Sequence, residues 1–158
     1  MTAYKYLQRM HIERQGSFPY PVPYKHKPNS SNGLTRCIVD YLNYSGAQAE
    51  RINSTGRMID NTKVVQDVLG RSIKIGSIDW IKGSSTKGTA DISSTIPISI
   101  NGITVGVSVK WEVKYAKDRQ SGVQKEYEEK INLAGGYYFV VRSFDDFYDK
   151  YCELIKPK

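Results

Sequence analysis

Cysteine, histidine and long apolar runs are scarce in this chain of 158 residues, and each scarcity narrows what the protein can be. The two cysteines, Cys37 and Cys152, lack CxxC spacing and fall in expected helices, so we predict free thiols in a reducing compartment. The two histidines, His11 and His26, lack the neighbours of a metal site and are expected at the surface. No apolar run could cross a bilayer and the N-terminus lacks an apolar signal-peptide core, so we expect a cytoplasmic protein.

Acidic residues are also fewer than basic ones. Lysine and arginine number 23 against 16 aspartate and glutamate residues, which gives a formal net charge of +7 and a pI of about 9.3. This balance favours an anionic partner such as nucleic acid, although a merely basic soluble protein has the same composition. The length predicts one domain with a core of its own.

The clearest pattern runs from residue 89 to residue 115, where two expected strands flank Asn101-Gly102. Asn-Gly is typical of a type I′ hairpin turn, because both central residues of that turn adopt positive φ. Apolar residues alternate with polar ones from Ile92 to Ile100, and again from Ile103 to Val113. A two-residue loop places both apolar rows on one face of a sheet.

The same register sets Asp91 directly opposite Glu112, with Lys114 one pleat further along that face. Two opposed carboxylates repel each other, so the arrangement needs a cation, which a divalent metal with oxygen ligands or Lys114 would supply. Pro97 could disrupt this register, because proline cannot donate to the strand pairing and often marks a bulge. A bulge there would turn Asp91 to the other face.

The residues around this hairpin form an ordered set that resembles the motif of the VRR-NUC branch of the PD-(D/E)xK nuclease superfamily. That branch has Lys-Gly-x-x-Asp-apolar before the hairpin and apolar-Glu-apolar-Lys in its second strand. In this chain the matching residues are Lys87, Gly88, Asp91 and Ile92, then Trp111, Glu112, Val113 and Lys114. The branch also has a Gln that opens the following helix, and Gln124 occupies that place. The resemblance spans about residues 31 to 142.

The resemblance implies an α/β fold, a three-layer α/β/α restriction-endonuclease-like core with a mixed central sheet. We expect this nuclease domain in residues 31–158, preceded by a basic, Tyr- and Pro-rich arm in residues 1–30. Its aromatic and basic residues could contact nucleic acid. An equally supported alternative is a strap that packs across the domain or a dimer partner.

The resemblance also implies a Mg²⁺- or Mn²⁺-dependent DNA endonuclease, a phosphodiester hydrolase that is structure-specific for branched, flap or Holliday-junction DNA. Asp91, Glu112 and the Val113 backbone carbonyl would hold the metal. Lys114 would orient the attacking water or stabilise the phosphate, and Gln124 would steady the water or a phosphate oxygen.

The chain departs from the family pattern in its first helix, where relatives carry a metal-binding Glu and this sequence has Ser31 and Asn32. Asn32 is a further candidate ligand through its amide oxygen, but one negative charge is missing. This departure motivates an alternative, a catalytically weak or inactive nucleic-acid-binding protein on the same fold. A second alternative is an interaction protein in which the acids and the lysine form only a cross-strand ion cluster.

Five further residues are candidate nucleic-acid contacts: Arg51, Lys87, Gly88, Lys117 and Arg119. For Arg51, Gly88 and the candidate catalytic residue Gln124, a purely structural role is as well supported as a functional one. Arg51 would pair with a core acid, Gly88 would serve an ordinary turn, and Gln124 would complete a capping box with Ser121.

The remaining elements are predicted from periodicity and caps. We expect helices at Asn32–Gly46, at Thr62–Leu69, after Ser121 and after Ser143. The buried stripe of the helix after Ser121 is expected to be Val123, Tyr127, Ile131 and Ala134. Strands are expected at Ala47–Asn53 and Tyr137–Val141, the latter buried on both faces. Residues 57–86 are expected to be an insertion or lid. Small relatives of this type often act as homodimers, so the resemblance implies a homodimer. A phage-encoded protein would work in the host cell cytoplasm.

Overall fold

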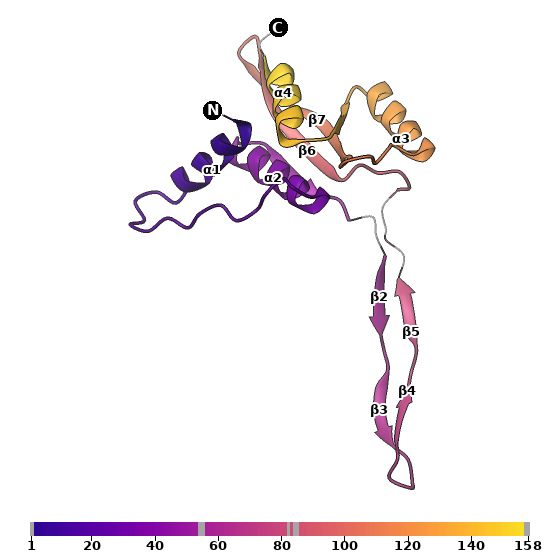
Figure 1. The fold of residues 1–158 in the computed structure, drawn as a ribbon. Helices are drawn as coiled ribbons and strands as arrows, with labels where there is room; N and C mark the ends of the chain where they lie inside the picture. The colour runs from indigo at the N-terminus through magenta and orange to yellow at the C-terminus, as the bar shows by residue number, and fades with distance from the viewer. Residues whose placement is uncertain (1, 54–55, 82, 84–85, 157–158) are drawn as a thin grey trace. The chain divides into compact units, whose positions relative to one another are not determined.

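The computed structural model describes residues 2–53, 56–81, 83 and 86–156, which divide into two compact units (Figure 1). Residues 1, 157 and 158, which belong to the expected arm and domain, lie outside the described residues. The first unit, Met1–Ile52 with Lys87–Lys158, contains α1 (Ala3–Glu13), α2 (Ser31–Tyr44), β1 (Gln48–Arg51), β6 (Ile92–Ile100), β7 (Ile103–Val113), α3 (Gly122–Leu133), β8 (Tyr137–Val141) and α4 (Phe144–Ile155). The second unit, Asn53–Thr86, contains β2 (Arg57–Asp60), β3 (Lys63–Gln66), β4 (Ser72–Ile75) and β5 (Ile78–Ile81).

The first unit is built on a mixed sheet with strand order β1-β6-β7-β8. β1, β6 and β7 are antiparallel neighbours, and β8 runs parallel to β7. The predicted hairpin register is confirmed from Ile100 opposite Ile103 back to Ile92 opposite Trp111, and Pro97 pairs with Gly106 without a slip. The turn has the expected geometry, with φ of 50° at Asn101 and 81° at Gly102.

The apolar face of the hairpin forms the core together with α1, α2 and α4. Trp111 is fully buried, and its ring lies 4.9 Å from that of Phe147 on α4. Ser94 interrupts the apolar row but is satisfied, since its Oγ accepts from Trp111 Nε1 (2.9 Å) and donates to the Val109 carbonyl (3.1 Å). The buried base of the hairpin therefore holds β6 and β7 rigidly at the end that bears the candidate site.

The far end of the hairpin extends beyond this core, and Ile100 and Ile103 are exposed. β8 is only partly buried, against the prediction of burial on both faces: Tyr138 and Val141 are buried, Phe139 and Val140 are half-buried, and Tyr137 is exposed. α3 stands apart from the other three helices and packs mainly against β8 (Figure 1). The prediction of a buried stripe at Val123, Tyr127, Ile131 and Ala134 is wrong, since no residue of α3 is buried and Ala134, its C-cap, is exposed.

The N-terminal segment is more ordered than its prolines suggested. Residues 3–13 form α1, which packs against α2 and α4 and fully buries Leu7. Tyr4 Oη donates to the His26 carbonyl (2.6 Å), which ties the following segment to α1. His11 and His26, expected at the surface, are half-buried, and the rings of both contact the ring of Tyr24. The segment thus corresponds to the strap alternative, here across its own domain.

The second unit is an antiparallel ribbon in which β2 pairs with β5 and β3 pairs with β4. The prediction of a helix at Thr62–Leu69 is wrong, because Lys63–Gln66 is β3. Val64 and Val65 are β-branched and find cross-strand partners in Lys74 and Ile73, an arrangement that favours a strand. The expected insertion at residues 57–86 lies within this unit.

The other helix predictions agree with the structure. α2 begins after the N-cap Ser30 and α4 after the predicted N-cap Ser143. Cys37 on α2 and Cys152 on α4 are free thiols, and burial raises the pKa of Cys37 to about 11. None of the helices in the described residues has the length and apolar character that a membrane crossing needs.

Candidate active site at the end of β7

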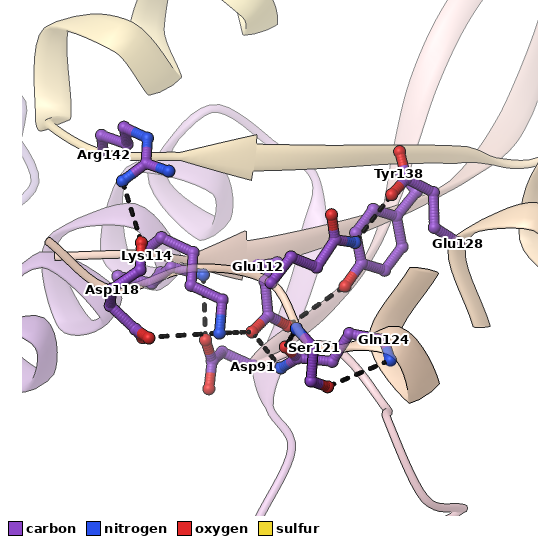
Figure 2. A network of polar contacts seen from close by, with 11 residues as sticks. Asp91, Glu112, Lys114, Asp118, Ser121, Gln124, Glu128, Tyr138 and Arg142 are labelled. Carbon is purple, nitrogen blue, oxygen red and sulfur yellow. Dashed lines mark hydrogen bonds and ion pairs between the residues drawn. The ribbon is translucent and has the colours of Figure 1, made fainter. Parts of the chain in front are cut away.

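The structure brings Asp91, Glu112, Lys114 and Gln124 together where β7 ends (Figure 2). Glu112 alternates with Trp111 along the strand, so its side chain lies on the sheet face opposite the core. Asp91 immediately precedes β6, and its Oδ2 accepts from the Val113 N–H (2.9 Å). The hairpin register therefore fixes the positions of both acids relative to each other.

The Glu112 carboxylate is the centre of the cluster. Its Oε1 lies 3.0 Å from Lys114 Nζ and accepts from Gln124 Nε2 (2.5 Å). Its Oε2 accepts from the hydroxyl of Tyr138 on β8 (3.2 Å). Three donors from three elements thus hold this one carboxylate (Figure 2).

Burial makes this cluster electrostatically unusual. Glu112 is 2% exposed and Lys114 is 6% exposed. Burial, and then the charge of Asp91, raises the pKa of Glu112, against the opposing effects of Lys114 and Tyr138. Burial alone would lower the pKa of Lys114, but Glu112 and Asp118 outweigh it and leave that pKa raised. Lys114 therefore acts as the internal counter-charge of Glu112 and Asp118.

The loop after β7 adds residues that the sequence did not single out. Asp118 lies 3.4 Å from Lys114 Nζ, so the lysine lies between two carboxylates. Arg142 donates to the carbonyls of Ala116 (3.4 Å) and Asp118 (3.1 Å). Ala116 has a φ of 53°, a conformation that costs energy in a residue other than glycine and that these contacts hold in place.

Gln124 combines the two roles that the sequence left open. Ser121 Oγ accepts from the Gln124 N–H, and Gln124 Oε1 accepts from the Ser121 N–H, which completes a capping box at the start of α3. The cap engages the amide oxygen and leaves the Gln124 NH₂ group directed at Glu112. The helix start therefore aims this side chain into the cluster.

Asn32 and Arg51 meet each other. Asn32 Oδ1 accepts from Arg51 Nη2 (2.8 Å), which engages the amide oxygen that was the candidate metal ligand. Arg51 lies opposite Ile92 in the sheet, one residue from Asp91. It therefore stands near the cluster but pairs with Asn32 rather than with a core acid.

The other candidate nucleic-acid contacts lie on the surface of the first unit. Lys87, Lys117 and Arg119 are exposed, the last two on the loop that carries Asp118. Gly88 has a φ of +78°, and a Cβ at this position would lie 2.4 Å from the Val123 carbonyl oxygen. A tight turn against the first turn of α3 thus explains this glycine without any ligand.

Gly88→Ala should lower the free energy of unfolding by about 3 kcal/mol, because strain at positive φ adds to a backbone clash. Gly102→Ala is the matched control, since Gly102 also has positive φ (+81°) but has nothing within 4 Å of the added methyl group. It should cost about 1 kcal/mol. Urea unfolding of both variants tests this, and equal losses would show that the approach to Val123 is unimportant.

The donor set fits a hard cation that is shared with a substrate. Among the described residues, no group of three or more His, Cys, Asp or Glu side chains is arranged to hold a metal ion. Mg²⁺ at phosphoryl-transfer sites, however, uses one or two carboxylates with waters and substrate phosphates. Asp91 and Glu112 are such a pair, and burial, followed by the charge of Asp91, raises the pKa of Glu112.

Two residues of the cluster could be found only in the folded chain. Tyr138 reaches Glu112 because β8 pairs in parallel with β7, a contact between residues 26 apart in sequence. Asp118 reaches Lys114 through an irregular loop. Comparison of the chain with protein-family models, curated proteins and solved structures found no match, so the assignment of this site depends on its geometry and on the sequence motif.

Proposed function

We propose that this protein is a metal-dependent DNA endonuclease that hydrolyses phosphodiester bonds in branched, flap or Holliday-junction DNA. One observation carries the proposal: Lys114 and Gln124 both contact Glu112, while Asp91 Oδ2 accepts from the backbone N–H of Val113, the residue between Glu112 and Lys114. The motif in the sequence named these residues as one set. The net charge of +7 adds long-range attraction for a polyanion.

Each residue of the set has a separate task in this proposal. Asp91 and Glu112, with the Val113 carbonyl, would hold Mg²⁺ or Mn²⁺, which supplies a Lewis acid and lowers the pKa of a bound water. Lys114 would orient the attacking water or stabilise charge on the phosphate, since its ammonium already lies within 3.0 Å of Glu112. Gln124 would hold a water or phosphate oxygen through its NH₂ group.

The reaction requires the cluster to open. Glu112 is 2% exposed, and Lys114 and Gln124 both occupy its Oε1. Asp118 offers Lys114 a second partner at 3.4 Å and is itself well exposed. Lys114 would therefore move toward Asp118 when a cation takes its place on Glu112, without loss of a counter-charge.

The three-layer restriction-endonuclease-like arrangement belongs to the same proposal. Its support is the distribution of helices: α2 and α4 pack on the sheet face that bears Trp111, and α3 delivers Gln124 to the face that bears Glu112. α3 would be the third layer.

A second candidate function is a nucleic-acid-binding protein with little or no catalytic activity. The observation that favours it is at the start of α2, where Asn32 stands in place of an acid and its amide oxygen accepts from Arg51. Such a protein would keep the basic surface and bind DNA without cutting it.

Incubation with labelled linear, flap and four-way DNA in Mg²⁺, Mn²⁺ or EDTA tests the proposal. We expect cleavage of a branched substrate with either metal and none in EDTA. Binding without metal-dependent cleavage would favour the second candidate. Neither binding nor cleavage would leave the cluster as an ion network that stabilises the fold.

A further inference from the structure

Tyr138 contacts Glu112 from the strand next to it. It lies on β8 opposite Lys110 of β7, and so on the same sheet face as Glu112. Its side chain is 6% exposed, and its ring lies 6.2 Å from the ring of Tyr127 on α3. The ring is thus held by packing, while the hydroxyl reaches Glu112 Oε2 at 3.2 Å.

The hydroxyl acts as a hydrogen-bond donor in this contact. A carboxylate oxygen has no proton to give, so in this pair the Tyr138 hydroxyl donates and Glu112 Oε2 accepts, at 3.2 Å. The acceptor is a carboxylate oxygen, and hydrogen bonds to charged groups are stronger than those between neutral groups.

The two carboxylate oxygens of Glu112 have different surroundings. Oε1 is held by Lys114 and Gln124, the two side chains that would exchange places with a cation, water or phosphate. Oε2 is held by Tyr138, whose packed ring has no such freedom. When Lys114 and Gln124 release Oε1, the Tyr138 hydroxyl remains to fix the rotamer of Glu112.

We propose that Tyr138 is a positioning residue that orients Glu112 so that Oε1 is presented to a divalent cation. The inference rests on the proposed function, because it assigns a metal-ligand role to Glu112. Residues that orient metal ligands change metal affinity about 10–100-fold when they are removed. Tyr138 touches neither the reacting phosphate nor the water in this account.

Tyr138→Phe is the decisive variant, because it removes the hydroxyl and keeps the ring. Tyr137→Phe is the matched control: the same change at the neighbouring residue, on an exposed side chain. We expect Tyr138→Phe to weaken Mn²⁺ binding by the protein alone about tenfold or more, measured by electron paramagnetic resonance titration. Tyr137→Phe should bind Mn²⁺ as the parent protein does.

Cleavage and stability give two further readouts. For Tyr138→Phe, the Mg²⁺ concentration for half-maximal cleavage should rise by a similar factor, while the rate at saturating Mg²⁺ returns to within about threefold of the parent. Equal Mn²⁺ affinities of Tyr138→Phe and Tyr137→Phe would overturn the proposal. So would an unfolding temperature in EDTA that falls in step with the affinity, because that shows a purely structural role.

The two failures are distinguishable. A parent protein that binds Mn²⁺ but cuts no DNA contradicts the proposed endonuclease function. The role of Tyr138 is then decided by the Mn²⁺ affinities of the two variants alone. If the parent protein cuts DNA and Tyr138→Phe shows the same metal dependence as the parent, only the proposed role of Tyr138 is contradicted.

Discussion

Glu112→Gln should reduce metal-dependent cleavage about a thousandfold or more while the protein stays folded. Glutamine has nearly the shape of glutamate, so Tyr138 and Gln124 keep a polar partner, and Lys114 keeps Asp118. What is lost is the negative charge that a Mg²⁺ ion requires at the end of β7. Initial rates on the best substrate of the DNA panel, with circular dichroism as the check on folding, measure both expectations.

Glu129→Gln is the control for this change, because Glu129 is an exposed residue of α3 and makes the same difference in net charge. It should cut at the parental rate. Equal activity of Glu112→Gln and the parent protein would remove Glu112 from the reaction and with it the proposed site. A parallel loss in both variants would point to overall charge and DNA attraction instead.

The acids and the lysine could be foreseen because a local rule fixes their positions. Asn101-Gly102 sets a two-residue turn, and the turn sets every pair in the hairpin down to Ile92 and Trp111. Alternating burial then assigns Glu112 to the face opposite the core. Pro97 did not disturb the register, because it pairs with Gly106 in the same two-residue-loop register as its neighbours.

Other parts of the fold depend on contacts that no local rule contains. Tyr138 reaches Glu112 only through the parallel pairing of β8 with β7, which joins distant segments. The four apolar residues within 62–69 fit a helix or a strand, and pairing with β4 across the ribbon favours the strand β3. Leu7 in α1 is buried at helical spacing from Ala3. The prolines later in the segment, however, predicted a stretch without regular structure.

Lys114→Met should destabilise the protein by about 3–5 kcal/mol and abolish cleavage, the largest combined effect of any single change at the site. Glu112 would remain in a buried position without its counter-charge, 2% exposed and close to Asp91. The double variant Glu112→Gln with Lys114→Met removes both buried charges and should recover most of the lost stability, yet it should still not cut DNA. Urea unfolding of the three variants gives the coupling between the two residues, and addition of Mn²⁺ should raise the unfolding temperature of the parent protein only. Additive losses in stability would show that the two charges do not depend on each other, and a metal-induced shift that persists in the double variant would place the cation elsewhere.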